Sequence, residues 1–147
     1  MRLHKNQKVE LIRRVPLFEQ CSRRELEQIA AIADEIDLAE GKQLMREGAP
    51  GREFFVILEG TADVVQHDAL VNTLGSGDFF GEIALIHQGP RTATVTTTSP
   101  LRALVVTDRS FRRLVEEQPE IERKVLEAAV DRLNPAFRRA AQPRSDH

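Results

Sequence analysis

The sequence predicts a mainly β protein with helices at both ends, on the evidence of two patterns. Between residues 35 and 107, short runs of β-branched and apolar residues alternate with glycines, as in short strands joined by tight turns. Before and after this stretch, apolar residues recur at helical spacing. Seven or eight short strands of this kind are typical of a sandwich, a jelly roll or a small barrel.

Two short helices are expected ahead of the first strand. One covers Lys8 to Arg14 and stops before Pro16, because the residue that precedes a proline disfavours the helical conformation. The other follows Ser22-Arg23-Arg24-Glu25, a capping-box sequence. Its apolar residues then recur every three or four positions, at Leu26, Ile29, Ala30 and Ala33.

The central stretch contains seven predicted strands, each bounded by turn residues. They are residues 36–39, 43–46, 54–58, 62–66, 70–74, 93–98 and 101–106. Residues 81–89 interrupt this series, and the apolar run at 83–86 is long enough for one turn of helix only.

Two helices are expected after the strands. Asp108 is a good N-cap for the first, and Pro119 suits the first turn of the second. Pro135 is expected to interrupt or end that second helix. We therefore predict one domain over residues 1–137, with strands at about 35–107, C-terminal helices at about 108–134 and a flexible tail at 138–147.

Composition narrows the possible functions. The 147 residues carry a net charge of −2, which gives no general attraction to DNA or membranes. There is no apolar run long enough to span a membrane and no signal peptide, and the single cysteine suits a reducing, cytoplasmic setting. The four histidines show no metal-ligand spacing, and no set of residues typical of an active site is present, so we expect neither a metal nor an enzyme.

The loop of residues 79–95 is the strongest functional signal. Gly81 allows the backbone to approach a ligand, and the residues after it could present free N–H groups at a helix start. Arg91, between Pro90 and a strand, can bind a phosphate through its planar guanidinium. Glu82 would repel a phosphate unless it accepts hydrogen bonds from a sugar hydroxyl, so the pair indicates a nucleotide. The alternatives are a surface salt bridge for Arg91 and a helix-cap carboxylate for Glu82.

These residues resemble a known family. Gly81-Glu82-Ile83-Ala84-Leu85, followed by Pro90-Arg91-Thr92-Ala93-Thr94-Val95, is similar to the phosphate-binding cassette of cyclic nucleotide-binding domains. The resemblance extends over about residues 15–133. It implies an eight-stranded β-roll, a double-stranded β-helix of the jelly-roll type, with flanking helices. It also implies a ligand, cAMP or cGMP, and no further cofactor.

The resemblance assigns a role to each cassette residue. Arg91 would pair with the cyclic phosphate, and Glu82 would take the ribose 2′-hydroxyl. Gly81 would leave room for the ribose, and backbone N–H groups near Ile83, Ala84 and Ala93 would line the phosphate. Thr92 would lie beside the phosphate and the base. A threonine here is associated with cGMP, but cAMP is the commoner ligand and remains our preference.

The resemblance also implies a cover for the base, drawn from the last helix. The candidates are Leu133 and Phe137, although Phe137 lies beyond Pro135 and could pack on its own domain instead. The protein would then be a regulatory sensor that signals to an unidentified effector protein, as a monomer or weak homodimer. The alternatives are the ligand-binding portion of a larger regulator, channel or transcription factor, or an interaction module that needs no nucleotide. The arginines near the C-terminus favour a solubilising tail over DNA binding.

Overall fold

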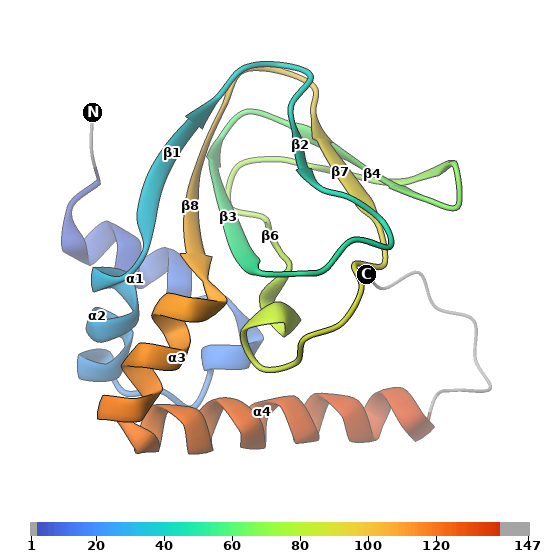
Figure 1. The fold of residues 1–147 in the computed structure, drawn as a ribbon. Coiled ribbons are helices and arrows are strands. Elements are labelled where there is room, and N and C mark those ends of the chain that lie inside the picture. Colours follow the sequence, from blue (N-terminus) through green and yellow to red (C-terminus); the bar gives the residue numbers. More distant parts are fainter. Residues whose placement is uncertain (1–2, 139–147) are drawn as a thin grey trace. The chain divides into compact units, whose positions relative to one another are not determined.

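The structure is a computed structural model that describes residues 3–138, with side chains described as far as residue 131. Its residues divide into two compact units (Figure 1). Residues 33–110 form the first unit, and residues 3–32 together with 111–138 form the second. The strands belong to the first unit, and the long helices belong mainly to the second.

The first unit is a β-roll, which among the described residues has eight strands in two sheets. One sheet has the order β1 (Asp34–Leu38), β8 (Leu101–Thr107), β3 (Glu53–Glu59) and β6 (Phe79–Phe80). The other has the order β2 (Gln43–Met45), β7 (Thr94–Thr97), β4 (Ala62–Gln66) and β5 (Ala69–Leu74). All the paired strands are antiparallel. The predicted fold class, a β-roll with flanking helices, is therefore confirmed.

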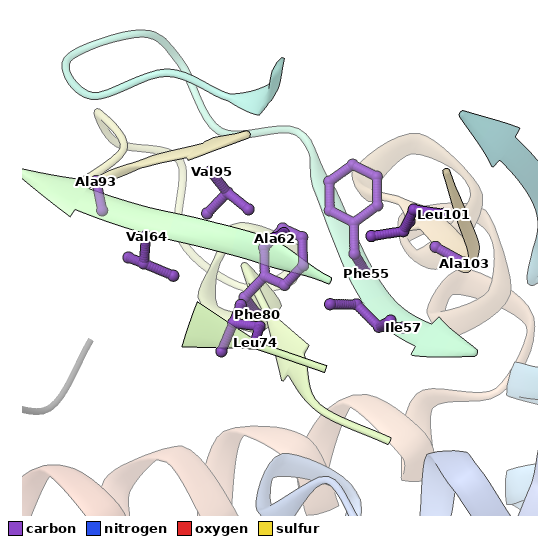
Figure 2. Close-up of a cluster of buried hydrophobic side chains, with 10 residues drawn as sticks. All are labelled: Phe55, Ile57, Ala62, Val64, Leu74, Phe80, Ala93, Val95, Leu101 and Ala103. Atoms are coloured by element: carbon purple, nitrogen blue, oxygen red, sulfur yellow. The ribbon is translucent and has the colours of Figure 1, made fainter. Parts of the chain in front are cut away.

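Side chains from both sheets form the core of the roll (Figure 2). The buried members are Phe55, Ile57, Ala62, Val64, Leu74, Phe80, Ala93, Val95, Leu101 and Ala103. The rings of Phe55 and Phe80 stack with their centroids 5.0 Å apart. Phe80 immediately precedes Gly81, so this stacking attaches the beginning of the 81–91 loop to the core.

The seven predicted strands are all present, and the structure adds β6 as an eighth. β6 has two residues, which are too few to show the alternation that identifies a strand in a sequence. It pairs with β3 through Phe55 and Val56, and this pairing leads the chain directly into Gly81.

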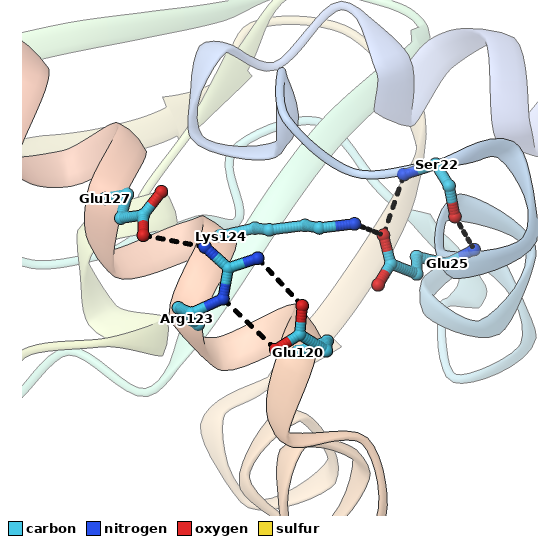
Figure 3. Close-up of polar contacts among 6 residues, drawn as sticks. All are labelled: Ser22, Glu25, Glu120, Arg123, Lys124 and Glu127. Carbon is cyan, nitrogen blue, oxygen red and sulfur yellow. Dashed lines mark hydrogen bonds and ion pairs between the residues drawn. The ribbon is translucent and has the colours of Figure 1, made fainter.

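The second unit contains α1 (Lys5–Arg13), η1 (Pro16–Phe18), α2 (Arg23–Ala31), most of α3 (Asp108–Glu117) and α4 (Pro119–Arg138). The capping box of α2 forms as predicted: Ser22 N donates to Glu25 Oε1 at 2.8 Å, and Glu25 N donates to Ser22 Oγ at 3.2 Å. Lys124 Nζ also donates to Glu25 Oε1 at 2.7 Å, which joins α4 to α2 (Figure 3).

Two predictions about the last helices were wrong. Thr107 caps α3 in place of Asp108, because the Ser110 amide donates to Thr107 Oγ1 at 3.1 Å. Thr and Asp are both good N-caps, so two adjacent candidates cannot be told apart by residue type. Helix α4 also continues through Pro135 to Arg138. A proline this close to the helix end removes one hydrogen bond of the last turn without ending the helix.

Among the described residues, no helix combines the length and apolarity needed to cross a membrane.

Candidate functional site

The cassette loop, residues 81–93, begins with a tight turn. Gly81 has φ of +82°, a left-handed conformation that glycine adopts without steric cost, and it precedes the short helical turn η2 (Glu82–Leu85). Ala84 and Leu85 are buried, whereas Ile83 is 51% exposed. The Ala84 amide donates to the Gly81 carbonyl at 3.1 Å. The Ala84 amide could donate to a ligand only if it shared this hydrogen bond or broke it.

The end of the loop is held by a second segment, residues 48–51, through backbone contacts. Gly48 N donates to the Arg91 carbonyl, and Arg91 N donates to the Ala49 carbonyl, both at 2.8 Å. Gly51 N donates to the Gly89 carbonyl at 3.1 Å, and Pro50 and Pro90 form a β-bridge. The backbone of Arg91 therefore has a fixed position, from which only the side chain is free to move.

The Arg91 side chain is confined by two glycines. A Cβ built on Gly51 would lie 3.0 to 3.2 Å from Cδ, Nε and Cζ of Arg91. A Cβ built on Gly81 would lie 2.8 Å from Arg91 Nη1 and 2.7 Å from the carbonyl oxygen of Glu53. The contacts from Gly81 are closer than a real side chain allows, and those from Gly51 are tight, so a side chain at either position would push the guanidinium from its present place.

Arg91 is a buried cation that lies beside the carboxylate of Glu53. Only 8% of the residue is exposed, and Nη2 donates to the Glu53 carbonyl oxygen at 2.7 Å. The nearest carboxylate oxygen of Glu53 is 3.5 Å from Nη2, and that side chain is 42% exposed. Burial lowers the pKa of the Arg91 guanidinium, and the charge of Glu53 acts in the opposite direction. Arginine still remains protonated at physiological pH, so this site holds a positive charge. The surface salt bridge considered from sequence does not describe a residue this deeply buried.

Of the other predicted ligand-binding residues, Gly81 lies against Arg91, Thr92 and Ala93 follow it in the chain, and the rest belong to η2. Glu82 follows Gly81 directly, as the first residue of η2, and is partly exposed. Thr92 is exposed, whereas the Ala93 side chain is fully buried in the core of the roll (Figure 2). The structure thus places a carboxylate, a buried guanidinium and a hydroxyl in one short loop, an arrangement suited to the sugar and phosphate of a nucleotide.

A cavity of about 260 Å³ borders the Arg91 side chain. Arg91 and Glu53 line it, with Arg46, Ala49, Pro50 and part of β2. This volume is slightly below the range of about 300–1,000 Å³ that is usual for small-molecule sites. A neighbouring cavity of about 280 Å³ is lined by Gly48, Pro50, Gly51, Arg52, Gln88, Gly89, Pro90 and Asp108.

The remaining features considered from sequence are the cover of the base, the cysteine and a metal site. Leu133 and Phe137 lie in the part of α4 whose side chains are outside the described residues. Burial raises the pKa of the Cys21 thiol to about 11, so this cysteine is an unreactive thiol at neutral pH. Within residues 3–138, the structure shows no group of three His, Cys, Asp or Glu side chains that could hold a metal ion.

Two residues that shape the site were missed from sequence: Gly51 and Glu53. Each lies about 40 positions before Arg91 in the chain, and nothing local indicates the contact. Glu53 resembles any charged residue at the start of an apolar strand, and Gly51 resembles any turn glycine. Only the antiparallel packing of the two segments brings them to Arg91.

Comparisons with known proteins agree with this geometry. The family model described as cyclic nucleotide-binding domain matches residues 35–118. A cAMP-dependent protein kinase regulatory subunit from Mycosarcoma maydis is 39% identical over 113 residues, which cover 69% of this chain. The chain spans about a fifth of that relative's length, 21%.

Two solved structures are also similar. The N-terminal domain of a transcriptional regulator from Streptomyces coelicolor A3(2) matches with a TM-score of 0.77 and 28% identity, over 86% of this chain and 94% of that domain. A cyclic nucleotide-binding-like protein from Brucella abortus bv. 1 str. 9-941 matches with a TM-score of 0.68 and 26% identity, over 75% of this chain and 98% of the other.

Proposed function

The chain belongs to the cyclic nucleotide-binding domain family, and we propose on that premise that it is a non-catalytic sensor of cAMP or cGMP. The observation that carries the proposal is Arg91. This buried guanidinium is confined by Gly51 and Gly81, and its ionic contact with the Glu53 carboxylate is long, at 3.5 Å. Such a group has strong remaining attraction for an anion, and a cyclic phosphodiester supplies one negative charge.

The proposed contacts follow from the loop. Arg91 would bind the phosphate, Glu82 would accept a hydrogen bond from the ribose 2′-hydroxyl, and Gly81 would let the sugar approach the backbone. The amides of Ile83, Ala84 and Ala93 are the proposed neutral donors to the phosphate. For Ala84 this requires a change, because its amide now donates to the Gly81 carbonyl.

We propose cAMP as the preferred nucleotide. The kinase regulatory subunit that this chain resembles is described as cAMP-dependent, which supports the choice. Thr92 is the counter-argument, because it is exposed and its hydroxyl would be the proposed partner of a guanine amino group. Titration of both nucleotides by calorimetry tests the choice directly: a lower dissociation constant for cGMP would reverse it.

The output of the sensor is proposed to be a change in α4 that an effector protein recognises. Both the kinase regulatory subunit and the transcriptional regulator are described as regulatory proteins, which supports this role. Ligand would shift α4 between positions by favouring one of them. Leu133 and Phe137 remain the proposed cover for the base. Hydrogen exchange tests this: cAMP should slow exchange in residues 119–137, and unchanged exchange would contradict the proposed response.

A thermal-shift titration tests ligand binding itself. Nucleotide at one hundred times its dissociation constant should add about 2.7 kcal/mol to the free energy of unfolding. Adenosine, which lacks the phosphate, is the matched control and should add little. If neither cAMP nor cGMP raises the melting temperature, the protein would instead be an interaction module that needs no nucleotide.

A further inference from the structure

Glu53 contacts Arg91 through both its backbone and its side chain. Its carbonyl oxygen accepts from Arg91 Nη2 at 2.7 Å, and its carboxylate lies 3.5 Å from the same atom. The two partners differ in exposure, because 7% of the Arg91 side chain and 42% of the Glu53 side chain are accessible. The carboxylate therefore covers the solvent side of a buried cation.

The backbone of Glu53 cannot move away when a ligand arrives. Glu53 is the first residue of β3 and is paired with Thr107 of β8, and its carbonyl is occupied by Arg91. An entering phosphate would displace the carboxylate, which can rotate toward solvent. It remains attached at the edge of the site, however, so its charge stays within a few ångströms of the bound phosphate.

The charges that line this cavity set a limit on the anion it can hold. Arg91 offers one buried positive charge, and Glu53 opposes any negative charge beyond that. Arg46 lines the same cavity but is exposed, so water screens its charge; water also screens part of the Glu53 charge, which however lies only 3.5 Å from Arg91. A phosphodiester with one charge is matched by Arg91 alone. A phosphate monoester carries about −1.5 to −2 at pH 7, and its additional charge would face the Glu53 carboxylate.

We propose that Glu53 is a specificity-determining residue that selects singly charged cyclic phosphodiesters against doubly charged 5′-phosphate monoesters. The inference rests on the proposed function, since it concerns the same anion site. Hydrolysis of the cyclic diester adds water, opens the ring and leaves a 5′-monophosphate with a second ionisable oxygen. A site with Glu53 would therefore bind the 5′-monophosphate weakly. The product of hydrolysis would then not compete with the cyclic nucleotide for the site.

The test compares cAMP with 5′-AMP on three proteins by calorimetry. They are the wild type, Glu53→Gln and Glu40→Gln. Glu53→Gln keeps the backbone carbonyl and the side-chain size while it removes the charge. Glu40→Gln removes an equal charge from an exposed position in the turn between β1 and β2. The wild type should prefer cAMP, and Glu53→Gln should reduce that preference by about three- to tenfold, the effect of one charge in a partly solvated site. Glu40→Gln should leave it unchanged.

An equal preference for cAMP over 5′-AMP in the wild type and in Glu53→Gln would overturn the inference. This holds even if the affinities for both ligands change, because a residue with a merely structural role would affect the two ligands alike. If Glu53→Gln does not fold, the wild type still decides the question with adenosine 5′-methyl phosphate, an open-chain ligand with one charge. It should bind at least about threefold more tightly than 5′-AMP. Equal affinities would count against charge selection, whereas a wild type that binds no cyclic nucleotide would refute the proposed function itself.

Discussion

The guanidinium of Arg91 lies directly against the backbone of Gly81. A Cβ at position 81 would come within 2.8 Å of Arg91 Nη1, and the same glycine has φ of +82°. One residue thus serves two purposes: it permits a left-handed turn at the start of η2, and it leaves space for the cation that we propose binds phosphate.

Gly81→Ala should therefore damage both folding and binding. Gly41 provides the control, since it has φ of +84° but no atom within 4 Å of a built Cβ. Each alanine should cost about 1–2 kcal/mol in the free energy of unfolding, because a side chain is strained in the left-handed region. Only Gly81→Ala should also raise the dissociation constant for cAMP, by more than about tenfold. Urea unfolding and calorimetry measure the two effects, and equal binding losses would show that Gly81 does not position Arg91.

Arg91→Lys should weaken cyclic nucleotide binding although the charge is kept. A lysine ammonium cannot reproduce the planar set of donors, and a charge-assisted hydrogen bond is worth about 1.5–3 kcal/mol. We expect the dissociation constant to rise by about ten- to a hundredfold in a calorimetric titration. Arg113→Lys, at an exposed position of α3, is the control and should bind normally. Unchanged affinity in Arg91→Lys would mean that the phosphate lies elsewhere.

Glu82→Ala should affect only ligands that carry the ribose 2′-hydroxyl. The variant should bind cAMP about tenfold more weakly, because a hydrogen bond to a charged carboxylate is lost. It should bind 2′-deoxy-cAMP as well as the wild type does. Titration of both ligands on both proteins gives the coupling between residue and hydroxyl. A similar loss for the two ligands would assign Glu82 a role in the structure of η2.

Thr92→Ala should weaken cGMP selectively. The Thr92 side chain is exposed near the end of the loop, and we propose that its hydroxyl contacts the guanine amino group. The loss of one neutral hydrogen bond predicts a three- to tenfold weaker interaction with cGMP, by the usual value of about 0.5–1.5 kcal/mol. The affinity for cAMP should change less. Equal losses for both nucleotides would indicate that the hydroxyl contacts the phosphate or the backbone.

Glu25→Gln should reduce stability at neutral pH but not in acid. Desolvation acts to raise the pKa of Glu25, but hydrogen bonds from Lys124 and Ser22 outweigh it and hold this pKa below its usual range (Figure 3). The charged form is therefore favoured by folding. Its contribution is complete above the unfolded-state pKa of about 4.3 and is lost as the pH falls through the lower folded-state value.

Urea unfolding over a pH series measures this effect. At pH 7 the variant should be about 0.5–1 kcal/mol less stable than the wild type, the range of one helix cap or one ion pair. The difference should shrink to zero in strong acid. Glu19→Gln, at an exposed position, should match the wild type at every pH. A difference that persists in acid would show that shape, and not charge, accounts for the role of Glu25.

Local patterns were sufficient to predict most of the fold. Alternating residues and glycines identified seven strands, and the Ser22–Glu25 sequence identified the start of α2. The errors occurred where local information is weak or ambiguous. β6 is too short to show a pattern, and Thr107 and Asp108 are equally good caps.

The site was predictable only in part. Gly81, Glu82 and Arg91 are close in sequence, so their shared chemistry could be inferred from the chain itself. The environment of Arg91 could not be, because Gly51 and Glu53 reach it through long-range packing. That environment determines whether the arginine is a surface charge or a buried one, which decides how strongly it attracts an anion.

Phe80 makes the binding loop a part of the folded core. Because its ring stacks on Phe55, the beginning of the loop cannot open without removing a large aromatic group from the interior of the roll. The loop should accordingly melt together with the roll, and not before it. A destabilising change anywhere in that core would then lower the number of folded molecules. Each molecule that remains folded would keep its normal affinity for the ligand. In a cell, such a change would weaken the signal because fewer folded molecules are present, and not because each molecule binds its ligand less well.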